Sequence, residues 1–334
     1  MKTLSLLVVC IATALSGFSQ VNRLVVAQDG TGKYKTVQAA FDAIPANNKK
    51  PLTVFIKNGV YKEKLHLDSS KAYVTVIGED KFNTILTYDD HTGKVYPNGL
   101  AINTQNSASF VVKAKDFTLE NITVENNAGF TAGQAVGLEV QGDKATIRNC
   151  RIIGNQDILF TSRDNSRQYY EDCYIEGTTD FIFGPATALF VRCTVHGKAN
   201  SFITAANTPA GKKFGFVFME CVVTADSSVN KLWLGRPWRG FAKTVFIRCE
   251  LPKQIAPEGW NNWANPENEK TVYYAEYKSS GDGADMSLRV PWAKRLSDKE
   301  AKEYTLQHIF SNESLAQDSN WFQQVPSYEW PSKK

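Results

Sequence analysis

The sequence lacks the motifs by which most hydrolases are recognised. It contains no Gly-x-Ser-x-Gly turn for a serine nucleophile, no His-Glu-x-x-His metal-binding helix and no cysteine pairs at zinc-ligand spacing. Histidine is scarce, and we expect solvated or structural roles for all four residues, His66, His91, His196 and His308. If the protein is an enzyme, carboxylates must carry its chemistry.

Long apolar runs are missing as well, except at the N-terminus. Lys2 precedes an almost wholly apolar stretch over residues 4–15, and small residues follow it. This pattern is typical of a secretory signal peptide, and the stretch is too short to cross a bilayer comfortably. We therefore predict a signal peptide over residues 1–19 and a secreted or periplasmic protein without a membrane anchor.

Neither sign of charge is in large excess. The 334 residues include 38 Lys and Arg against 34 Asp and Glu, and no basic block is interleaved with aromatic residues. This balance does not favour nucleic acid as a partner, although it is compatible with an acidic polymer. Because no linker or low-complexity stretch interrupts the chain, we predict one domain over residues 20–334.

The cysteines beyond the leader stand in one recurring phrase, and successive copies lie 20 to 28 positions apart. The five copies are Ile-Arg-Asn-Cys-Arg-Ile (147–152), Tyr-Glu-Asp-Cys-Tyr-Ile (170–175), Phe-Val-Arg-Cys-Thr-Val (190–195), Phe-Met-Glu-Cys-Val-Val (218–223) and Phe-Ile-Arg-Cys-Glu-Leu (246–251). One repeat earlier, we expect Asn121 to take the cysteine's place.

Each phrase reads as a short β-strand, because apolar and β-branched residues alternate in it. A strand that recurs every 20–30 residues, with no helical pattern between copies, predicts a solenoid of parallel strands. The cysteines would then stack in a buried column as small apolar fillers. Disulfides between neighbouring coils remain an alternative, although an odd number of cysteines leaves one unpaired.

Short helices are expected near both ends of the solenoid. Apolar residues at helical spacing over residues 37–44 stop at Pro45, which suits a helix that caps the open core. A capping box at residues 297–300 opens a second helix toward Phe310. Three aromatic residues beyond it are expected to pack along the outside, namely Trp321, Phe322 and Trp330.

Two aspartates stand out by their position in the repeat. Asp157 and Asp180 each follow a repeat cysteine, Cys150 and Cys173, by seven positions. Equal phase on adjacent parallel coils stacks one residue over the other at about 4.8 Å. Two carboxylates this close do not both ionise readily, so one would serve as an acid beside an anionic nucleophile.

A cation that could keep one carboxylate ionised is found in Leu-Gly-Arg-Pro-Trp (234–238). The guanidinium of Arg236 can bind a carboxylate through two parallel hydrogen bonds. The alternative is an internal Asp–Arg bridge with a purely structural role, since such networks also perturb carboxylates.

The chain resembles the pectin methylesterases. The resemblance rests on five motifs that occur in the family's order between Val25 and a point beyond Tyr277, namely Gly-Val-Tyr-Lys-Glu (59–63), Gly-Gln-Ala-Val (133–136), Gln-Asp-Ile-Leu (156–159), Asp-Phe-Ile-Phe-Gly (180–184) and Leu-Gly-Arg-Pro-Trp (234–238). It implies an all-β, right-handed parallel β-helix and an esterase that needs neither a metal ion nor an organic cofactor.

The resemblance also implies residue roles. Asp180 matches the nucleophile that attacks the methyl ester of a galacturonate unit, and Asp157 matches the general acid and base. Gln134 and Gln156 match the amides that stabilise the oxyanion, and Arg236 matches the residue that orients and ionises the nucleophile.

Aromatic residues are expected to form the walls of the substrate site. Trp238 matches a residue that stacks on sugar, and the further walls would be Phe160, Phe183 and Trp260; core packing is the alternative for these aromatics. Ile158 departs from the threonine usual in the family. A buried apolar neighbour there would raise the pKa of Asp157 slightly.

The expected partner is methylated pectin, and a β-helix with capped ends can stand as a monomer. Two alternatives remain: a pectin-cleaving lyase or glycoside hydrolase on the same fold, and a non-catalytic carbohydrate-binding solenoid.

Overall fold

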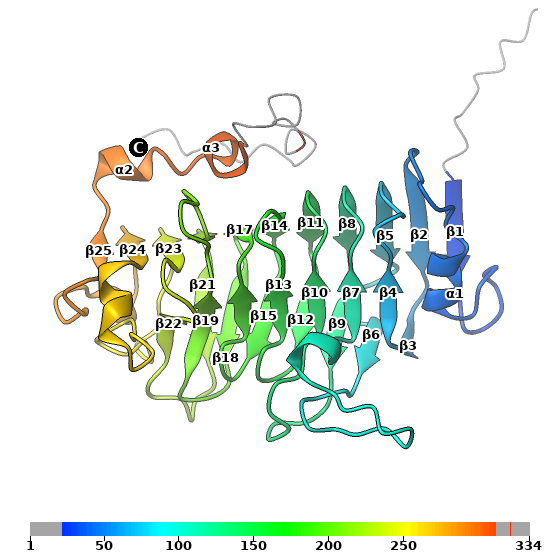
Figure 1. Cartoon of the computed structure of the whole chain (residues 1–334), viewed down its shortest axis with the longest axis horizontal. Coiled ribbons are helices and arrows are strands. Elements are labelled where there is room, and N and C mark those ends of the chain that lie inside the picture. The colour runs from blue at the N-terminus through cyan, green and yellow to red at the C-terminus, as the bar shows by residue number, and fades with distance from the viewer. Residues whose placement is uncertain (1–21, 312–320, 322–334) are drawn as a thin grey trace, which may run out of the picture.

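The computed structural model describes residues 22–311 and residue 321, in which strands stack as the coils of a solenoid (Figure 1). The predicted signal peptide, Phe322 and Trp330 lie outside the described residues. Each coil contributes strands to three sheets, and neighbouring strands within every sheet are parallel. The fold is the predicted parallel β-helix.

The strands of the described chain form one sheet of eleven and two sheets of seven. The eleven-stranded sheet has the order β1 (Asn22–Val26), β2 (Leu52–Ile56), β5 (Val74–Gly78), β8 (Phe117–Glu120), β11 (Ala145–Arg148), β14 (Arg167–Glu171), β17 (Thr187–Val191), β20 (Phe216–Met219), β23 (Lys243–Ile247), β24 (Tyr273–Tyr277) and β25 (Lys294–Arg295). The second sheet has the order β21 (Val222–Ala225), β18 (Thr194–Gly197), β15 (Tyr174–Gly177), β12 (Arg151–Ile153), β9 (Thr123–Asn126), β6 (Thr84–Tyr88) and β3 (Gly59–Lys62). The third sheet has the order β22 (Trp233–Pro237), β19 (Phe202–Ala206), β16 (Ile182–Gly184), β13 (Leu159–Thr161), β10 (Leu138–Val140), β7 (Phe110–Val112) and β4 (Leu65–Leu67).

Helices are short in this part of the chain. They are α1 (Val37–Asp42), α2 (Asp298–Ala301) and α3 (Leu306–Phe310), together with the 3-10 helices η1 (Thr104–Asn106), η2 (Pro266–Lys270) and η3 (Asp282–Ala284). No helix among the described residues is long and apolar enough to cross a membrane.

A left-handed residue turns the chain from the eleven-stranded sheet into the second sheet. The residues immediately before the five cysteines have φ between 48° and 53°, namely Asn149, Asp172, Arg192, Glu220 and Arg248. Asn121 has φ of 55°, and the strand register aligns it with Asn149. The residue in the cysteine column is therefore the buried Ile122. The prediction for Asn121 is wrong by one position, because Asn121 occupies the bend.

The five described cysteines are buried and free. Each thiol donates a weak hydrogen bond of 3.5 to 3.6 Å to a backbone carbonyl of the preceding coil. The column of small fillers is therefore confirmed, and the disulfide alternative is not adopted between these residues. Next to the cysteines, an aromatic column crosses the core, with centroid separations of 4.7, 4.5 and 4.5 Å along Tyr170, Phe190, Phe218 and Phe246.

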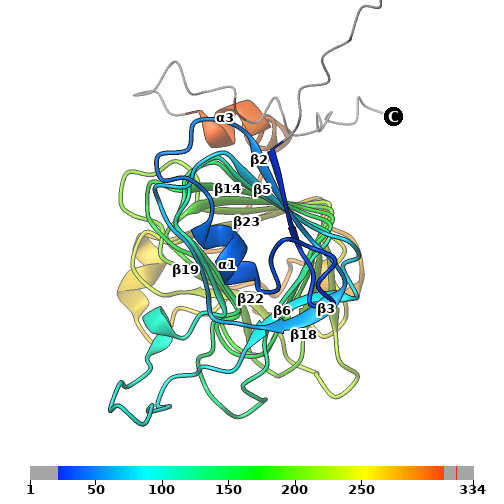
Figure 2. The same cartoon turned by 90° about the vertical axis from the view of Figure 1, so that its right-hand side faces the viewer.

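The N-terminal end of the core is closed as predicted. Helix α1 lies across the open end of the coils (Figure 2), and Thr36 caps its N-terminus. Its buried Phe41 stacks on Phe110 at 5.5 Å between ring centroids. The helix ends at Asp42, slightly earlier than Ile44.

The C-terminal helices do not close the other end. The predicted capping box between Ser297 and Glu300 is present, but α2 ends at Ala301, and α3 begins again after its own cap, Thr305. Both helices pack on the outer face of the eleven-stranded sheet, where their apolar side chains join those of β14, β17, β20, β23 and β24 (Figure 1). The prediction of a single helix toward Phe310 is therefore wrong, because Thr305 acts as a second N-cap and begins a new helix.

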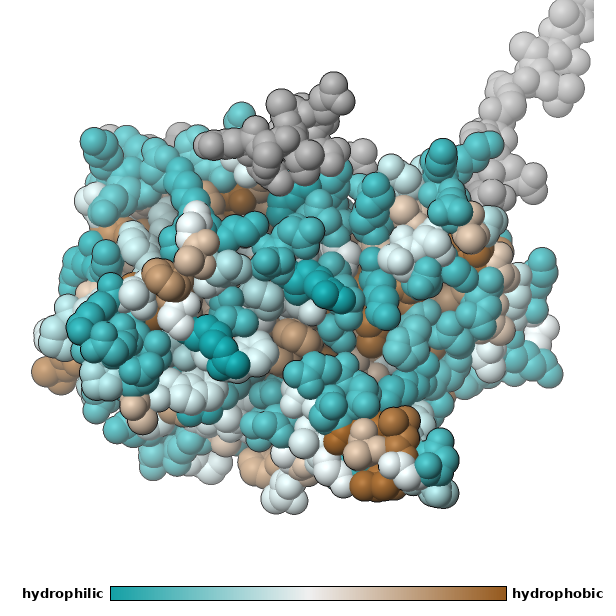
Figure 3. Space-filling view, viewed as in Figure 1, coloured by the Kyte–Doolittle hydropathy of each residue, from teal (hydrophilic) through white to brown (hydrophobic). Residues whose placement is uncertain are grey.

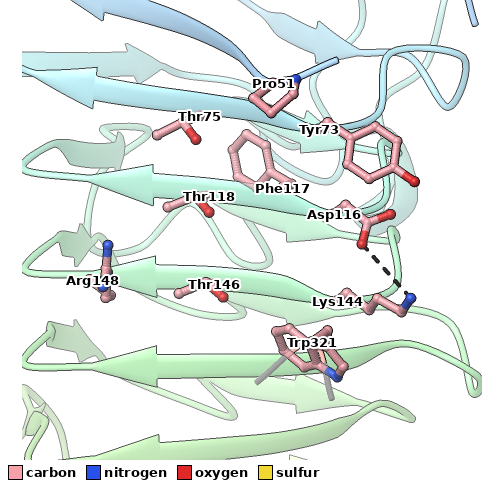
Figure 4. A pocket seen from close by; sticks show the side chains of 10 residues that line it. All are labelled: Pro51, Tyr73, Thr75, Asp116, Phe117, Thr118, Lys144, Thr146, Arg148 and Trp321. Carbon is pink, nitrogen blue, oxygen red and sulfur yellow. Dashed lines mark ion pairs between the residues drawn. The ribbon is translucent and has the colours of Figure 1, made fainter. Parts of the chain in front are cut away.

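Trp321 lies along the outside of the solenoid, as expected. Its ring packs 5.1 Å from that of Phe310. It borders a cavity of about 290 Å³ over β5, β8 and β11, whose floor includes Thr75, Thr118 and Thr146 in matching register (Figure 4).

The aromatic column predicts where the core is least tolerant of truncation. Phe218→Ala removes a fully buried ring that is stacked on both sides, so we expect a loss of about 3–5 kcal/mol in the free energy of unfolding. Phe130→Ala is the matched control, because this side chain is 60% exposed. It should change the free energy of unfolding by less than about 0.5 kcal/mol. Urea unfolding of both variants tests this, and equal losses would contradict the role of the column.

Candidate functional site

A cavity of about 250 Å³ lies on the outer face of the third sheet. Twelve residues line it, and they are Thr104, Gln105, Gln134, Gln156, Asp157, Phe160, Asp180, Phe183, Ala205, Arg236, Trp238 and Trp263. All five residues predicted for the chemistry are among them. Three of the four predicted aromatic walls are there too, whereas the four histidines are not.

The floor of the cavity is a column of outward-facing residues from four successive coils. Phe160 aligns with Phe183, Phe183 with Ala205, and Ala205 with Arg236 in the parallel register. The two phenylalanine rings stack at 4.4 Å, and the ring of Trp238 meets both edge-on. Because Ala205 has only a methyl group, space remains between the stacked rings and the guanidinium of Arg236.

Asp157 and Asp180 occupy the same position on adjacent coils. They precede Leu159 and Ile182, which are paired in the register, by two residues each. Both have left-handed backbones, with φ of 63° and 50°, a conformation that aspartate tolerates better than most residues. The equal phase seen in the sequence is therefore realised in space. As whole residues, Asp157 and Asp180 are 8% and 5% exposed.

Arg236 binds Asp180 through both arms of its guanidinium. Nε donates to Oδ1 at 2.9 Å and Nη2 donates to Oδ2 at 2.7 Å. This two-point hydrogen bond fixes the plane of the carboxylate and favours its charged form. The carboxyl group of Asp157, by contrast, has no hydrogen-bond partner among the described residues.

The environment separates the two acids. Burial, together with the neighbouring Asp180 charge, raises the pKa of Asp157 to about 8, and the more distant Arg236 opposes the shift. Burial also raises the pKa of Asp180, but the hydrogen bonds and charge of Arg236 oppose that shift directly. Asp180 is therefore the member that ionises first. Near neutral pH the pair presents a carboxylate beside a carboxylic acid.

Two side-chain amides face the same cavity. Gln134 and Gln156 form a parallel bridge between coils, and the backbone of Ala135 donates to the carbonyl of Gln156 at 3.1 Å. Within the described chain, neither side-chain amide forms a hydrogen bond with another residue. Their N–H groups are thus free to donate to an oxygen atom of a bound molecule.

Trp260 does not lie at the site, which corrects the expectation that it forms a wall. Its side chain is 1% exposed, stacks on Tyr274 at 4.4 Å and donates to Glu276 at 3.3 Å. The second tryptophan of the Gly-Trp-Asn-Asn-Trp segment, Trp263, lines the cavity instead. The choice between two tryptophans three positions apart depends on a turn that the repeat pattern does not specify.

Thr104 and Gln105 line the cavity too, although neither was predicted as a site residue. They belong to η1, at the end of a long connection between β6 and β7 that projects from the coils (Figure 1). An apolar patch is visible at the lower right of Figure 3. Within the connection itself, the apolar residues Val95 and Leu100 are exposed. This insertion is not part of the repeat, so its position over the cavity could not be predicted from the phase of the repeat.

Ile158, the departure from the family pattern, points into the core. A Cβ atom added to Gly137 or Gly154 would lie only 2.6 or 2.3 Å from its Cδ1. The side chain is fully buried and fills the space that these two glycines leave.

Within the described ranges, no three His, Cys, Asp or Glu side chains converge as a metal site would require.

Comparison with known proteins gives consistent matches. The family model described as Pectinesterase matches residues 23–313. Pectinesterase 31 of Arabidopsis thaliana is 36% identical over 301 residues, which cover 89% of this chain and 93% of that protein. The pectin methylesterase from carrot has a TM-score of 0.80 at 32% identity, covering 89% of this chain and 95% of that one. A pectin methylesterase crystallised with a hexasaccharide has a TM-score of 0.79 at 27% identity, covering 88% and 98%.

The raised pKa of Asp157 predicts a pH-dependent cost to the fold. Since the folded-state pKa of about 8 exceeds the usual value of 3.8, the folded protein retains a proton that the unfolded chain releases. The contribution of Asp157 to stability is therefore complete below pH 4 and is lost as pH rises toward 8. Asp157→Asn should raise the free energy of unfolding by about 1–3 kcal/mol at pH 8 and by much less at pH 4.5. Urea unfolding at the two pH values measures this, and an equal effect at both would contradict it.

Proposed function

The chain belongs to the pectinesterase family, and on this premise we propose that it hydrolyses the methyl esters of galacturonate units in pectin. The products are methanol and de-esterified pectin. The observation that carries the mechanism is the constellation of Asp157, Asp180 and Arg236 at one cavity. Gln134 and Gln156 complete it with free amide donors.

Asp180 is the nucleophile. Arg236 holds its carboxylate in one plane and favours its charge, so an oxygen atom can attack the carbonyl carbon of the ester. The carbonyl oxygen becomes an oxyanion in the tetrahedral intermediate. The side-chain amides of Gln134 and Gln156 donate to this oxygen, where the charge develops.

Asp157 is the acid and then the base. Its raised pKa keeps a proton available, and it transfers this proton to the methoxy oxygen as the C–O bond breaks and methanol leaves. An anhydride then links Asp180 to the galacturonate. The Asp157 carboxylate removes a proton from water, which attacks the anhydride, and the second tetrahedral intermediate collapses to release galacturonate and the Asp180 carboxylate.

The aromatic walls of the cavity suit a sugar chain. Phe160 and Phe183, which are 8% and 4% exposed, line the cavity with Trp238, and Trp263 adds a wall on the side of Arg236. Sugar rings carry C–H groups on their faces, which pack on aromatic rings while hydroxyls remain free for polar contacts. Pectin lies outside the cell, so export of this chain through its N-terminal leader is part of the proposal.

Loss of the nucleophile provides the first test. Asp180→Ala should lower methanol release from highly methylated pectin by more than about 10³-fold, because the covalent route is removed. Polymer binding and the unfolding transition should remain close to wild type. Wild-type turnover in this variant would rule out the mechanism.

The same assay separates the alternative functions. The wild type should release methanol without new reducing ends, and a chelator should leave the rate unchanged. New reducing ends would instead indicate cleavage of the glycan chain, and the absence of any product would indicate a binding solenoid.

Loss of an oxyanion donor provides a second test. Gln134→Ala should lower kcat about 10²–10³-fold with a smaller change in KM, because the donated hydrogen bond strengthens as the oxyanion forms. Gln105→Ala is the matched control, since this amide lines the same cavity without an assigned part in the chemistry. Equal losses in the two variants would contradict the assignment.

A further inference from the structure

The guanidinium of Arg236 is enclosed between two aromatic rings. Its Cζ atom lies 4.1 Å from the ring centroid of Phe202 and 3.7 Å from that of Trp263. Both separations are well inside the range in which a cation is attracted by the face of an aromatic ring. Arginine suits such a site because its planar group stacks while its edge remains free to donate hydrogen bonds.

The stack continues beyond Phe202 and is anchored to the coils. The ring of Phe202 packs on Trp233 of the next coil at 4.9 Å, and Nζ of Lys231 lies 4.8 Å from the centroid of Trp233. The register pairs Phe202 with Trp233. The ring of Phe202 therefore also packs on a residue of the neighbouring strand β22.

Phe202 also holds the other partner of the ion pair. Its backbone carbonyl accepts the amide hydrogen of Asp180 at 2.8 Å. One residue therefore contacts the nucleophile through its backbone and the guanidinium through its ring. Phe202 does not line the cavity, so these contacts do not require it to touch substrate.

Trp263 reaches the guanidinium from an irregular turn. Trp263 and Ala264 have consecutive left-handed backbones, with φ of 59° and 52°, which is unfavourable for both residue types. The side chain of Asn261 accepts the amide hydrogen of Trp263 at 2.7 Å, and Asn268 donates to the carbonyl of Asn262 at 3.0 Å. The surrounding asparagines thus stabilise a strained turn. This turn places the ring of Trp263 over the guanidinium of Arg236.

We infer that Phe202 and Trp263 are positioning residues that clamp Arg236 in the orientation in which it binds Asp180. The inference rests on the proposed function, since it assigns these rings a role in the same ion pair. A guanidinium with one face unsupported can turn out of the plane of the carboxylate and lose one of its two hydrogen bonds. The nucleophile would then spend more time protonated.

The charges around Asp180 determine what such a change would do. The groups that face it are Arg236, Asp157 and, from the core, the phenol of Tyr274. Among them Arg236 alone lowers the pKa of Asp180, against the effect of burial. Loosening the guanidinium should therefore raise this pKa and move the acid limb of the pH–rate profile to higher pH.

The test is the pH dependence of methanol release by Phe202→Leu, which keeps apolar bulk but removes the ring face. We expect the acid limb of kcat to move up by about 0.5–1 pH unit and kcat at pH 5 to fall about 3- to 10-fold. KM should change less than about twofold. Phe202→Tyr, which retains the ring face, should restore the wild-type profile.

Phe241→Leu is the matched control, because Phe241 is 45% exposed and does not line the cavity. An acid limb for Phe202→Leu that coincides with wild type would overturn the inference. If Phe202→Leu fails to fold, Trp263→Leu provides the same readout from the exposed side, although its KM should change as well. Asp180→Ala separates the two proposals. An active Asp180→Ala variant would refute the ester hydrolysis mechanism. An inactive Asp180→Ala variant, together with an unshifted acid limb for Phe202→Leu, would refute only the clamp.

Discussion

The parallel register between successive coils is the constraint on which this protein depends. A residue of one coil lies over its counterpart in the next coil, at the distance that separates neighbouring hydrogen-bonded strands. The same rule that stacks Phe190 on Phe218 inside the core stacks Asp157 near Asp180 on the outside. Core and cavity are therefore two faces of one repeated geometry.

The chemistry follows from placing two acids and one guanidinium in a poorly solvated groove. Burial raises the pKa of both carboxyl groups, and the two-point bond from Arg236 opposes this for Asp180 only. In the proposed mechanism, this asymmetry divides the roles of nucleophile and acid between chemically identical side chains. That mechanism needs no histidine, because burial and the Asp180 charge raise the pKa of Asp157 to about 8.

Much of this arrangement was readable because the coils repeat in phase. The cysteine column, the strands and the equal phase of Asp157 and Asp180 all follow from one periodic pattern. The errors lie where the period is least informative: Asn121 was shifted by one position at a left-handed bend, and Trp260 was chosen in place of Trp263 beyond the last repeat phrase. The second N-cap at Thr305 likewise divides a pattern that reads as one helix.

Local patterns and periodicity were enough to predict the solenoid, and the five ordered motifs predicted the family and the pairing of Arg236 with Asp180. The rings of Phe202 and Trp263, which contact the guanidinium of Arg236, became apparent only in the folded chain. The orientation of a long side chain is set by all the surfaces that enclose it. In this protein those surfaces come from separate coils and from an irregular turn, which no single stretch of sequence encodes.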